Sequence, residues 1–142
     1  ARLHLPNGQV TRSLWKESCK ALHKLRIARN VKVLFRGMTQ FAEVRFYFSS
    51  RMQEKDIPLA LISLFSPPDP GLMEASSNTV LSCMHQGDDG LAVVEVNCII
   101  AGVAMVPYTN GPNSIGTWFF VAEKMGLDVT CMDGRQESIV NE

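Results

Sequence analysis

The stretch Leu91–Tyr108, LAVVEVNCIIAGVAMVPY, is the longest nearly uncharged run in the chain. Its length is marginal for a membrane span, and Glu95 and Asn97 interrupt it, so the sequence argues against one. β-Branched residues dominate on both sides of Gly102. The pattern predicts a half-buried strand, a bend or bulge at Gly102, and a second strand that ends at Pro107. Before the glycine, one face of the strand is predicted to carry Val94, Val96, Cys98 and Ile100.

Shorter runs on both sides of this stretch predict further strands. An Asn7-Gly8 turn is predicted between two short extended pieces near the N-terminus. In FAEVRFYF, residues 41–48, strict alternation predicts that Phe46 shares a face with Val44, while Tyr47 shares the opposite face with Glu43. Arg36-Gly37 begins a turn, and residues 49–56 are predicted to form a polar loop or turn. The other predicted strands are Asn30–Phe35, Ile57–Phe65, Thr79–Met84 and Thr117–Val121.

One helix is predicted near the N-terminus. Ser13 is placed to cap a helix that runs from Leu14 towards Ile27. Apolar and small residues fall on one stripe, and lysines fall largely off it, so the helix is amphipathic and basic. The basic face either contacts a partner or is simply the solvated side of a helix that covers the core.

The 142 residues indicate one domain with a single sizeable core. Hydrophobic residues make up 46% and charged residues 20%, as in an ordinary globular domain. Residues 1–37 are predicted to be a basic hairpin and helix lead-in, residues 38–121 a β-barrel core, and residues 122–142 a tail. The expected fold class is mainly β (α+β), a small bent sheet or partly open barrel with one N-terminal amphipathic helix.

The formal net charge of zero hides a strong polarity along the chain. Residues 1–55 contain twelve Lys or Arg and three Asp or Glu, whereas residues 56–142 contain two and eleven. A basic half indicates an anionic partner such as nucleic acid. The alternative is that the two halves neutralise each other in the folded protein.

The basic residues at the start of the chain are the candidate binding site. Cations on a helix, its exit and the next two strands can follow a phosphate backbone without reading base sequence. The expected phosphate contacts are Lys16, Lys20, Lys24, Arg29, Lys32, Arg36 and Arg45. Aromatic residues near strand ends can stack on bases or cage a methylated lysine, although such residues more often belong to a core. The expected aromatic contacts are Tyr47, Tyr108 and Trp118.

The sequence gives little support for catalysis or metal binding. Two short pairs, Cys19 with His23 and Cys83 with His85, supply four atoms that zinc accepts, but their spacing matches no zinc motif. The alternative is packed cysteines and solvated histidines, so no metal or other cofactor is expected. Asp88-Asp89 lies in a glycine-flanked turn, where aspartate is favoured for backbone reasons. No nucleophile elbow or phosphate loop is present, and we expect no catalytic residues.

Several runs, in order, resemble the C-terminal region of large proteins encoded by basidiomycete DNA transposons of the CACTA-like (Plavaka) kind. The runs are HLPNGQVTRSLWKE, KLRIARNVKV, FAEVRFYF, LALISLFSPPDPGLMEASSNTVLSC and VVEVNCIIAGVAMVP. The resemblance implies an accessory module of a fungal, nuclear protein that lies beyond the catalytic core. The layout of strands also looks like the bromo-adjacent homology (BAH-like) barrel of chromatin-binding modules, a likeness of pattern alone.

These observations predict a non-catalytic module that binds nucleic acid or chromatin within a transposon-derived fungal protein. The first alternative is a protein–protein interaction or oligomerisation module, which docks another domain of the parent protein or a second copy. The second alternative is a fragment of a metal-dependent nuclease. The sequence leaves the oligomeric state open.

Overall fold

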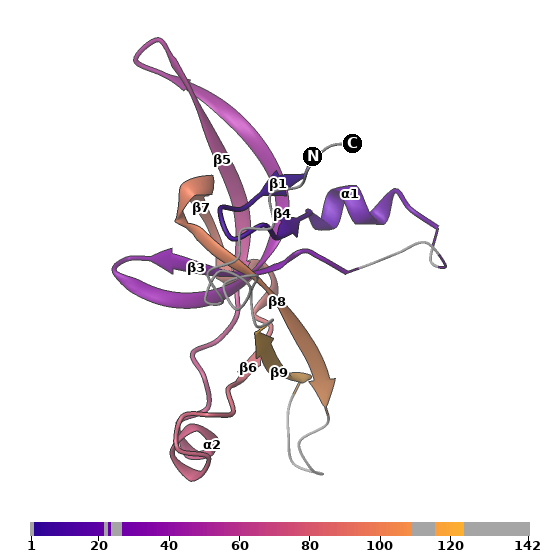
Figure 1. The fold of residues 1–142 in the computed structure, drawn as a ribbon, viewed down its shortest axis with the longest axis vertical. Coiled ribbons are helices and arrows are strands. Elements are labelled where there is room, and N and C mark those ends of the chain that lie inside the picture. The colour runs from indigo at the N-terminus through magenta and orange to yellow at the C-terminus, as the bar shows by residue number, and fades with distance from the viewer. Residues whose placement is uncertain (1, 22, 24–26, 109–115, 124–142) are drawn as a thin grey trace, which may run out of the picture.

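The computed structural model describes residues 2–21, 23, 27–108 and 116–123. In this part of the chain the fold is mainly β, as predicted, and it consists of an open seven-stranded antiparallel sheet, a small two-stranded sheet and two short α-helices (Figure 1). No closed barrel forms among these residues. The elements are β1 Leu3–His4, β2 Val10–Thr11, α1 Leu14–Ser18, β3 Asn30–Phe35, β4 Met38–Met52, β5 Lys55–Leu64, α2 Pro70–Ala75, β6 Ser82–Met84, η2 Gly87–Gly90, β7 Leu91–Glu95, η3 Val96–Cys98, β8 Ile99–Tyr108 and β9 Trp118–Glu123.

The large sheet is strongly curled. Its strand order is β6-β9-β8-β3-β4-β5-β7, so β7 lies at one edge and β8 lies beyond β3 on the far side of β4. The three-residue 3-10 turn η3 nevertheless joins β7 directly to β8. Because so short a connection spans little distance, the strands between β7 and β8 must bend round towards each other. The predicted bend of the Leu91–Tyr108 stretch therefore lies at η3, and the predicted bulge lies two residues before Gly102, where a register shift with β3 leaves Ile100 without a partner.

Two tight hairpins shape the sheet, and both turns use left-handed backbone. Arg36 and Gly37 have φ of 51° and 74° and join β3 to β4, as the predicted turn requires. Gln53 and Glu54 have φ of 49° and 64° and join β4 to β5. Two-residue turns of this kind match the twist of antiparallel strands. The long β4–β5 hairpin projects from the centre of the molecule (Figure 1). Its turn at Gln53 and Glu54 falls within the predicted loop or turn at residues 49–56, but the rest of that range is strand.

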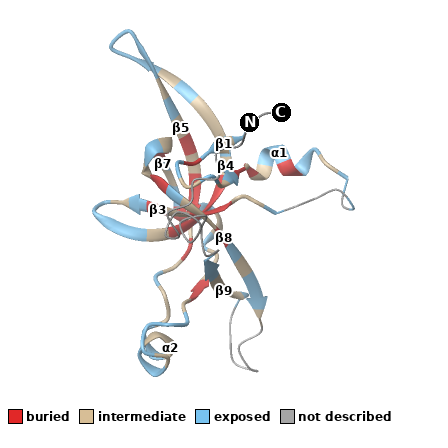
Figure 2. Cartoon of the chain, viewed as in Figure 1, coloured by how far each residue is buried: buried red, intermediate tan, exposed pale blue. Residues whose placement is uncertain are grey.

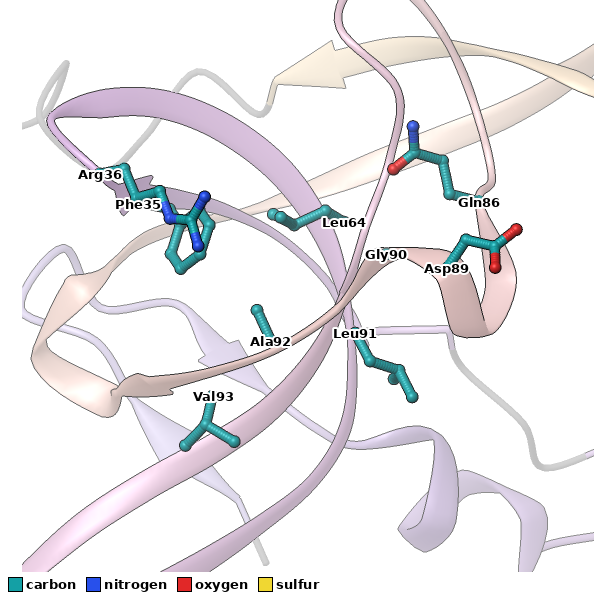
Figure 3. Close-up of a pocket in the computed structure, with 9 residues that line it drawn as sticks. All are labelled: Phe35, Arg36, Leu64, Gln86, Asp89, Gly90, Leu91, Ala92 and Val93. Carbon is teal, nitrogen blue, oxygen red and sulfur yellow. The ribbon is translucent and has the colours of Figure 1, made fainter.

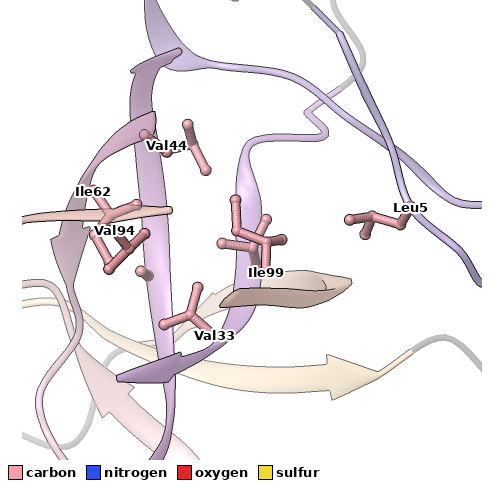
Figure 4. Close-up of a cluster of buried hydrophobic side chains, with 9 residues drawn as sticks. Leu5, Val33, Val44, Ile62, Val94 and Ile99 are labelled. Atoms are coloured by element: carbon pink, nitrogen blue, oxygen red, sulfur yellow. The ribbon is translucent and has the colours of Figure 1, made fainter. Parts of the chain in front are cut away.

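The first core lies inside the curl, and buried residues gather where the strands cross (Figures 2 and 4). Leu5 enters this core from the β1–β2 hairpin, whose Asn7-Gly8 turn is confirmed. The remaining members come from five strands of the sheet: Val31, Val33, Ala42, Val44, Ala60, Ile62, Val94 and Ile99. A second, smaller core packs on the other face of the sheet and contains Phe41, Phe65, Cys83 and Val103. Below, "outer face" means the face of β4, β5 and β7 that points away from the first core.

A β-bulge at Arg45 corrects the predicted alternation on β4. The register with β5 shifts between Val44 and Phe46, which leaves Arg45 without a partner. One extra residue moves every later side chain to the opposite face. Tyr47 therefore packs against the first core, where its hydroxyl shares a 2.8 Å hydrogen bond with Thr11 Oγ1, and Phe46 points outward. The assignment of Phe46 to the face of Val44 is wrong.

The same kind of shift corrects the predicted faces around Gly102. The η3 turn changes the parity, so that Ile99 is buried and Ile100 is exposed. Gly102 serves instead as a docking point for the β1–β2 hairpin. Its backbone N–H donates to Gln9 Oε1 at 2.8 Å, and its carbonyl accepts from Gln9 Nε2 at 3.3 Å. A Cβ at Gly102 would stand 3.4 Å from Thr11 Cγ2, which is van der Waals contact, so the hairpin packs closely against this position.

Helix α1 is shorter than predicted. Ser13 caps it by accepting a hydrogen bond from the Lys16 N–H, as expected, but the helix ends at Ser18. Its buried side chain is Glu17 and not a member of the predicted apolar stripe. The part of that stripe at residues 22 and 25 lies outside the described residues. None of the helices in the described ranges has the length and apolar character needed to cross a membrane.

Candidate functional site

A buried ion-pair network fastens α1 to the outer face of the sheet. Glu17 is 1% exposed and accepts hydrogen bonds from the Ala28 N–H at 2.6 Å and from Arg29 Nη1 at 2.9 Å. Arg29 Nε donates to Glu43 Oε2 on β4 at 2.8 Å. Burial alone would lower the pKa of Arg29, but the hydrogen bonds to both carboxylates outweigh this effect and raise its pKa. The positive charge of Arg29 is therefore already paired with carboxylates inside the fold.

Two other cations of the predicted site also meet carboxylates. Arg45 Nε lies 3.3 Å from Glu43 Oε1, an ion pair without hydrogen-bond geometry. Lys32 Nζ lies 3.0 Å from Oε1 of Glu123 on β9. Arg29, Lys32 and Arg45, three of the expected phosphate contacts, therefore already lie against carboxylates of the fold. Of these three, Lys32 alone is neutralised by the acidic half of the chain, because Glu17 and Glu43 belong to the basic half.

The remaining predicted phosphate contacts do not form one group. Arg36 occupies the tip of the β3–β4 hairpin, where its guanidinium lies 5.1 Å from the centroid of the Phe35 ring. Lys24 lies outside the described residues. Lys16 and Lys20 lie on and just after α1.

Lys16 and Lys20 belong to a cluster of cations at the N-terminal end of the fold. The charge of Arg12 lowers the pKa of Lys20, with further lowering by desolvation and by the charges of Arg2 and Lys16, and Glu17 opposes the shift. None of the four cations makes an ion pair with another described residue. We call Arg2, Arg12, Lys16 and Lys20 the cation cluster.

Arg12 gives the cation cluster a fixed anchor. Its backbone N–H donates to the Ala28 carbonyl at 2.8 Å, which ties the end of β2 to the segment that leads into β3. Its Nε atom is buried and has no acceptor among the described residues. A buried donor without a partner costs on the order of 1–3 kcal/mol.

The three predicted aromatic contacts lie in two different places. Tyr47 is on the first core, and burial raises the pKa of its hydroxyl. Tyr108 stacks on Phe120 with ring centroids 3.9 Å apart, and its hydroxyl bonds to Ser82 Oγ. Trp118 pairs with Tyr108 across β8 and β9. The structure thus brings Tyr108 and Trp118 together and separates them from Tyr47.

An apolar groove beside α1 was missed by the sequence reasoning. Trp15 is 62% exposed and Phe46 is 40% exposed, and both line a groove of about 520 Å³ between α1 and the outer face. Alternation assigned Phe46 to the face of Val44, and the sequence around Trp15 does not indicate its distant neighbours on the sheet. We call this feature the outer groove, and it is lined by Leu14, Trp15, Ser18, Arg45, Phe46, Leu61, Asp88 and Leu91.

A second groove, of about 490 Å³, lies along the edge strand β7. It runs between the residues from Gly90 to Val93 and the tip of the β3–β4 hairpin at Phe35 and Arg36 (Figure 3). A Cβ at Gly90 would stand 2.5 Å from the Leu64 carbonyl oxygen, so glycine is needed where β7 begins beside β5. Asp89 and Gln86 line the other end of this groove.

The cysteine and histidine pairs do not build a metal centre within the described ranges, where no group of three or more His, Cys, Asp or Glu side chains is placed to hold a metal. Cys19 is exposed, whereas Cys83 is buried in the second core. Burial raises the pKa of the Cys83 thiol to about 11. His85 packs edge-on against Phe65, and its Nε2 lies 3.4 Å from Glu43 Oε1.

Comparison with known proteins gives no match to a family model, a curated protein or a solved structure. The geometry therefore carries the functional argument. It defines a mainly β module with a cation cluster at one end of a short helix and an apolar groove along the same helix.

Proposed function

We propose that this chain is a non-catalytic module that binds nucleic acid through the cation cluster. The observation that carries the proposal is the grouping of three other cations around Lys20, since Arg12, Arg2 and Lys16 each act to lower the pKa of Lys20 and none of the four has an ion-pair partner among the described residues. Like charges held together repel one another, and a chain of phosphates relieves that repulsion while counterions are released. Phosphate contacts of this kind position a nucleic acid without reading its sequence.

The proposal narrows the predicted site. Lys16 and Lys20 remain as expected phosphate contacts, and Arg2 and Arg12 join them. Arg29, Lys32 and Arg45 are assigned to holding the fold together because carboxylates already engage them. Such a module would suit the nuclear, chromatin-associated accessory role that the resemblance to transposon proteins implies.

The salt dependence of binding tests the proposal. For each tenfold rise in salt concentration, the affinity for a labelled DNA should fall by about 0.9 log unit per contacted phosphate for a duplex and by about 0.7 log unit for a single strand. Replacing two exposed cations, Lys16→Glu with Lys20→Glu, should weaken binding. It should also reduce the salt slope by about 1.8 for a duplex or about 1.4 for a single strand. Fluorescence anisotropy over a series of NaCl concentrations measures both effects.

A matched control lies at the tip of the β4–β5 hairpin. Arg51→Glu with Lys55→Glu makes the same change in net charge at two exposed positions outside the cation cluster. This control should keep the wild-type salt slope. Equal losses in the two double variants would show a response to net charge alone, and no DNA binding by the wild type at low salt would end the proposal.

Protein–protein interaction is a second candidate, favoured by the edge of β7. This strand pairs with β5 on one side, and no other described strand pairs with its second side. Its Val93 is 53% exposed, and an open strand edge can accept a strand from a partner. Light scattering should then show a concentration-dependent dimer that Val93→Lys disrupts, and a monomer at every concentration would contradict self-association.

A further inference from the structure

The outer groove continues as an apolar row across three strands. Phe46 on β4 lies opposite Leu61 on β5, and Leu61 lies opposite Val93 on β7. Register partners in antiparallel strands share a face, so all three side chains point outward. Trp15 and Leu14 of α1 form the opposite wall of the groove. Contiguous exposed apolar surface of this kind marks an interaction site more often than isolated apolar residues do.

The charges around the outer groove are arranged asymmetrically. Lys16 of the cation cluster follows Trp15 directly in α1, about 100° further round the helix, so the cation lies on the same short helix but is not part of the groove lining. Arg45 also lines the groove, with its guanidinium against Glu43. Asp88 of η2 contributes the negative charge on the sheet side. A ligand that fits this pattern has flat apolar groups beside a row of negative charges.

We propose that the outer groove stacks unpaired bases, so that the nucleic acid bound at the cation cluster is single-stranded. This inference rests on the proposed function and adds the class of nucleic acid to it. The phosphates lie along Arg12, Lys16 and Lys20, and the bases turn into the groove against Trp15 and Phe46. Base stacking on exposed aromatic rings tolerates any sequence because every base has a π-face. A duplex buries those faces in its own stack and gains nothing from the groove.

Two other possible occupants of the outer groove fit these features less well. A second copy of the chain would bring the same cations towards the cation cluster if the groove paired with itself, which like-charge repulsion opposes. An acidic peptide with apolar side chains also satisfies the charges, but the free strand edge that could hold such a peptide belongs to β7, and β5 separates β7 from Phe46 on β4. Bases joined by phosphates match both the aromatic rings and the adjacent cations.

The test compares three polyanions of different base accessibility: oligothymidylate, a duplex of the same length, and heparin, which carries charge without bases. The wild type should prefer oligothymidylate at equal salt. Trp15→Ala and Phe46→Ala should each weaken oligothymidylate binding by roughly 5- to 150-fold and leave duplex and heparin binding unchanged. Lys16→Glu with Lys20→Glu should weaken the binding of all three.

An optical measurement keeps the test independent of folding defects in these variants. The chain has two tryptophans, so Trp118→Phe leaves Trp15 as the sole tryptophan reporter. Oligothymidylate should quench and shift the emission of Trp15, whereas heparin should not. In the same protein, Phe46→Ala should reduce that quenching.

The outcomes separate the two proposals. If none of the three polyanions binds at low salt, the proposed function fails. If all three bind but Trp15→Ala and Phe46→Ala change nothing, or weaken duplex and single strand equally, the proposed function stands and the stacking inference fails. A dimer or an acidic-peptide complex that Trp15→Ala abolishes while oligothymidylate binding survives would also overturn the inference.

Discussion

The outer face of the sheet is covered at Glu43 and open at Phe46, although both positions lie on β4. At Glu43, helix α1 brings a buried carboxylate and the segment before β3 brings Arg29, so charges meet charges beneath the helix. At Phe46, the same helix brings Trp15 to the rim of a groove that remains open to solvent. One short helix therefore closes one row of the sheet and leaves the next row available for a ligand.

The difference depends on which partner each side chain meets. Arg29 and Lys16 are both cations near α1, but two carboxylates engage Arg29, whereas Lys16 stands among other cations. The first arrangement stabilises the fold, because separating either carboxylate from Arg29 would leave a buried charge without a partner. The second arrangement leaves charge free for an external anion. Residue type alone does not decide between these roles.

The largest expected effect comes from removing the cation beneath α1. Arg29→Met would leave the buried carboxylates of Glu17 and Glu43 without their shared partner. The free energy of unfolding should fall by about 3–5 kcal/mol. Chemical denaturation measures this loss. Arg51→Met, an exposed change of the same kind on β4, should stay within about 0.5 kcal/mol of the wild type. A loss below about 1 kcal/mol for Arg29→Met would show that the covered region does not depend on its ion pairs.

Much of the fold was predictable from the sequence because periodic apolar patterns and turn residues act locally. The range Asn30–Phe35 was predicted as observed, and the Arg36-Gly37 turn follows from chemistry that any two-residue hairpin needs. The two errors in side-chain direction have one cause. A bulge at Arg45 and a 3-10 turn at residues 96–98 each change the parity of a strand, and neither leaves a clear mark in the sequence.

The second expected effect sharpens the contrast between inner and outer positions on both sides of the bulge. Ile62 lies opposite Val44 in the first core and is fully buried, so Ile62→Ala should cost about 3 kcal/mol. Phe46→Ala removes a larger side chain, but that side chain is already partly in water, and we expect a cost of about 1 kcal/mol. Thermal or urea unfolding of the two variants compares them directly. A larger loss for Phe46→Ala would place Phe46 inside, as simple alternation predicts.

The candidate site was less predictable than the fold, for a physical reason. The basic half of the chain was visible in the composition, but the free and engaged cations differ only in their distance from a carboxylate, which is Glu17 or Glu43 for two of the engaged cations and Glu123 for Lys32. Such distances depend on long-range packing, such as that of α1 on β4, which local patterns do not encode. Trp15 was missed for the same reason, because its neighbours in the outer groove come from β4, β5, η2 and β7.

The smallest expected effect concerns an exposed ion pair. It tests whether solvent exposure decides how much a paired cation contributes to the free energy of unfolding. Lys32 and Glu123 form a pair at 3.0 Å with half of the Glu123 side chain exposed, so water and salt screen their attraction. A double-mutant cycle with Lys32→Ala and Glu123→Ala should give a coupling of about 0.2–1 kcal/mol that shrinks as salt rises. A coupling as large as the loss expected for Arg29→Met would mean that the β3–β9 region also depends on charge pairing. The distinction between covered and open cations would then have to rest on something other than solvent access.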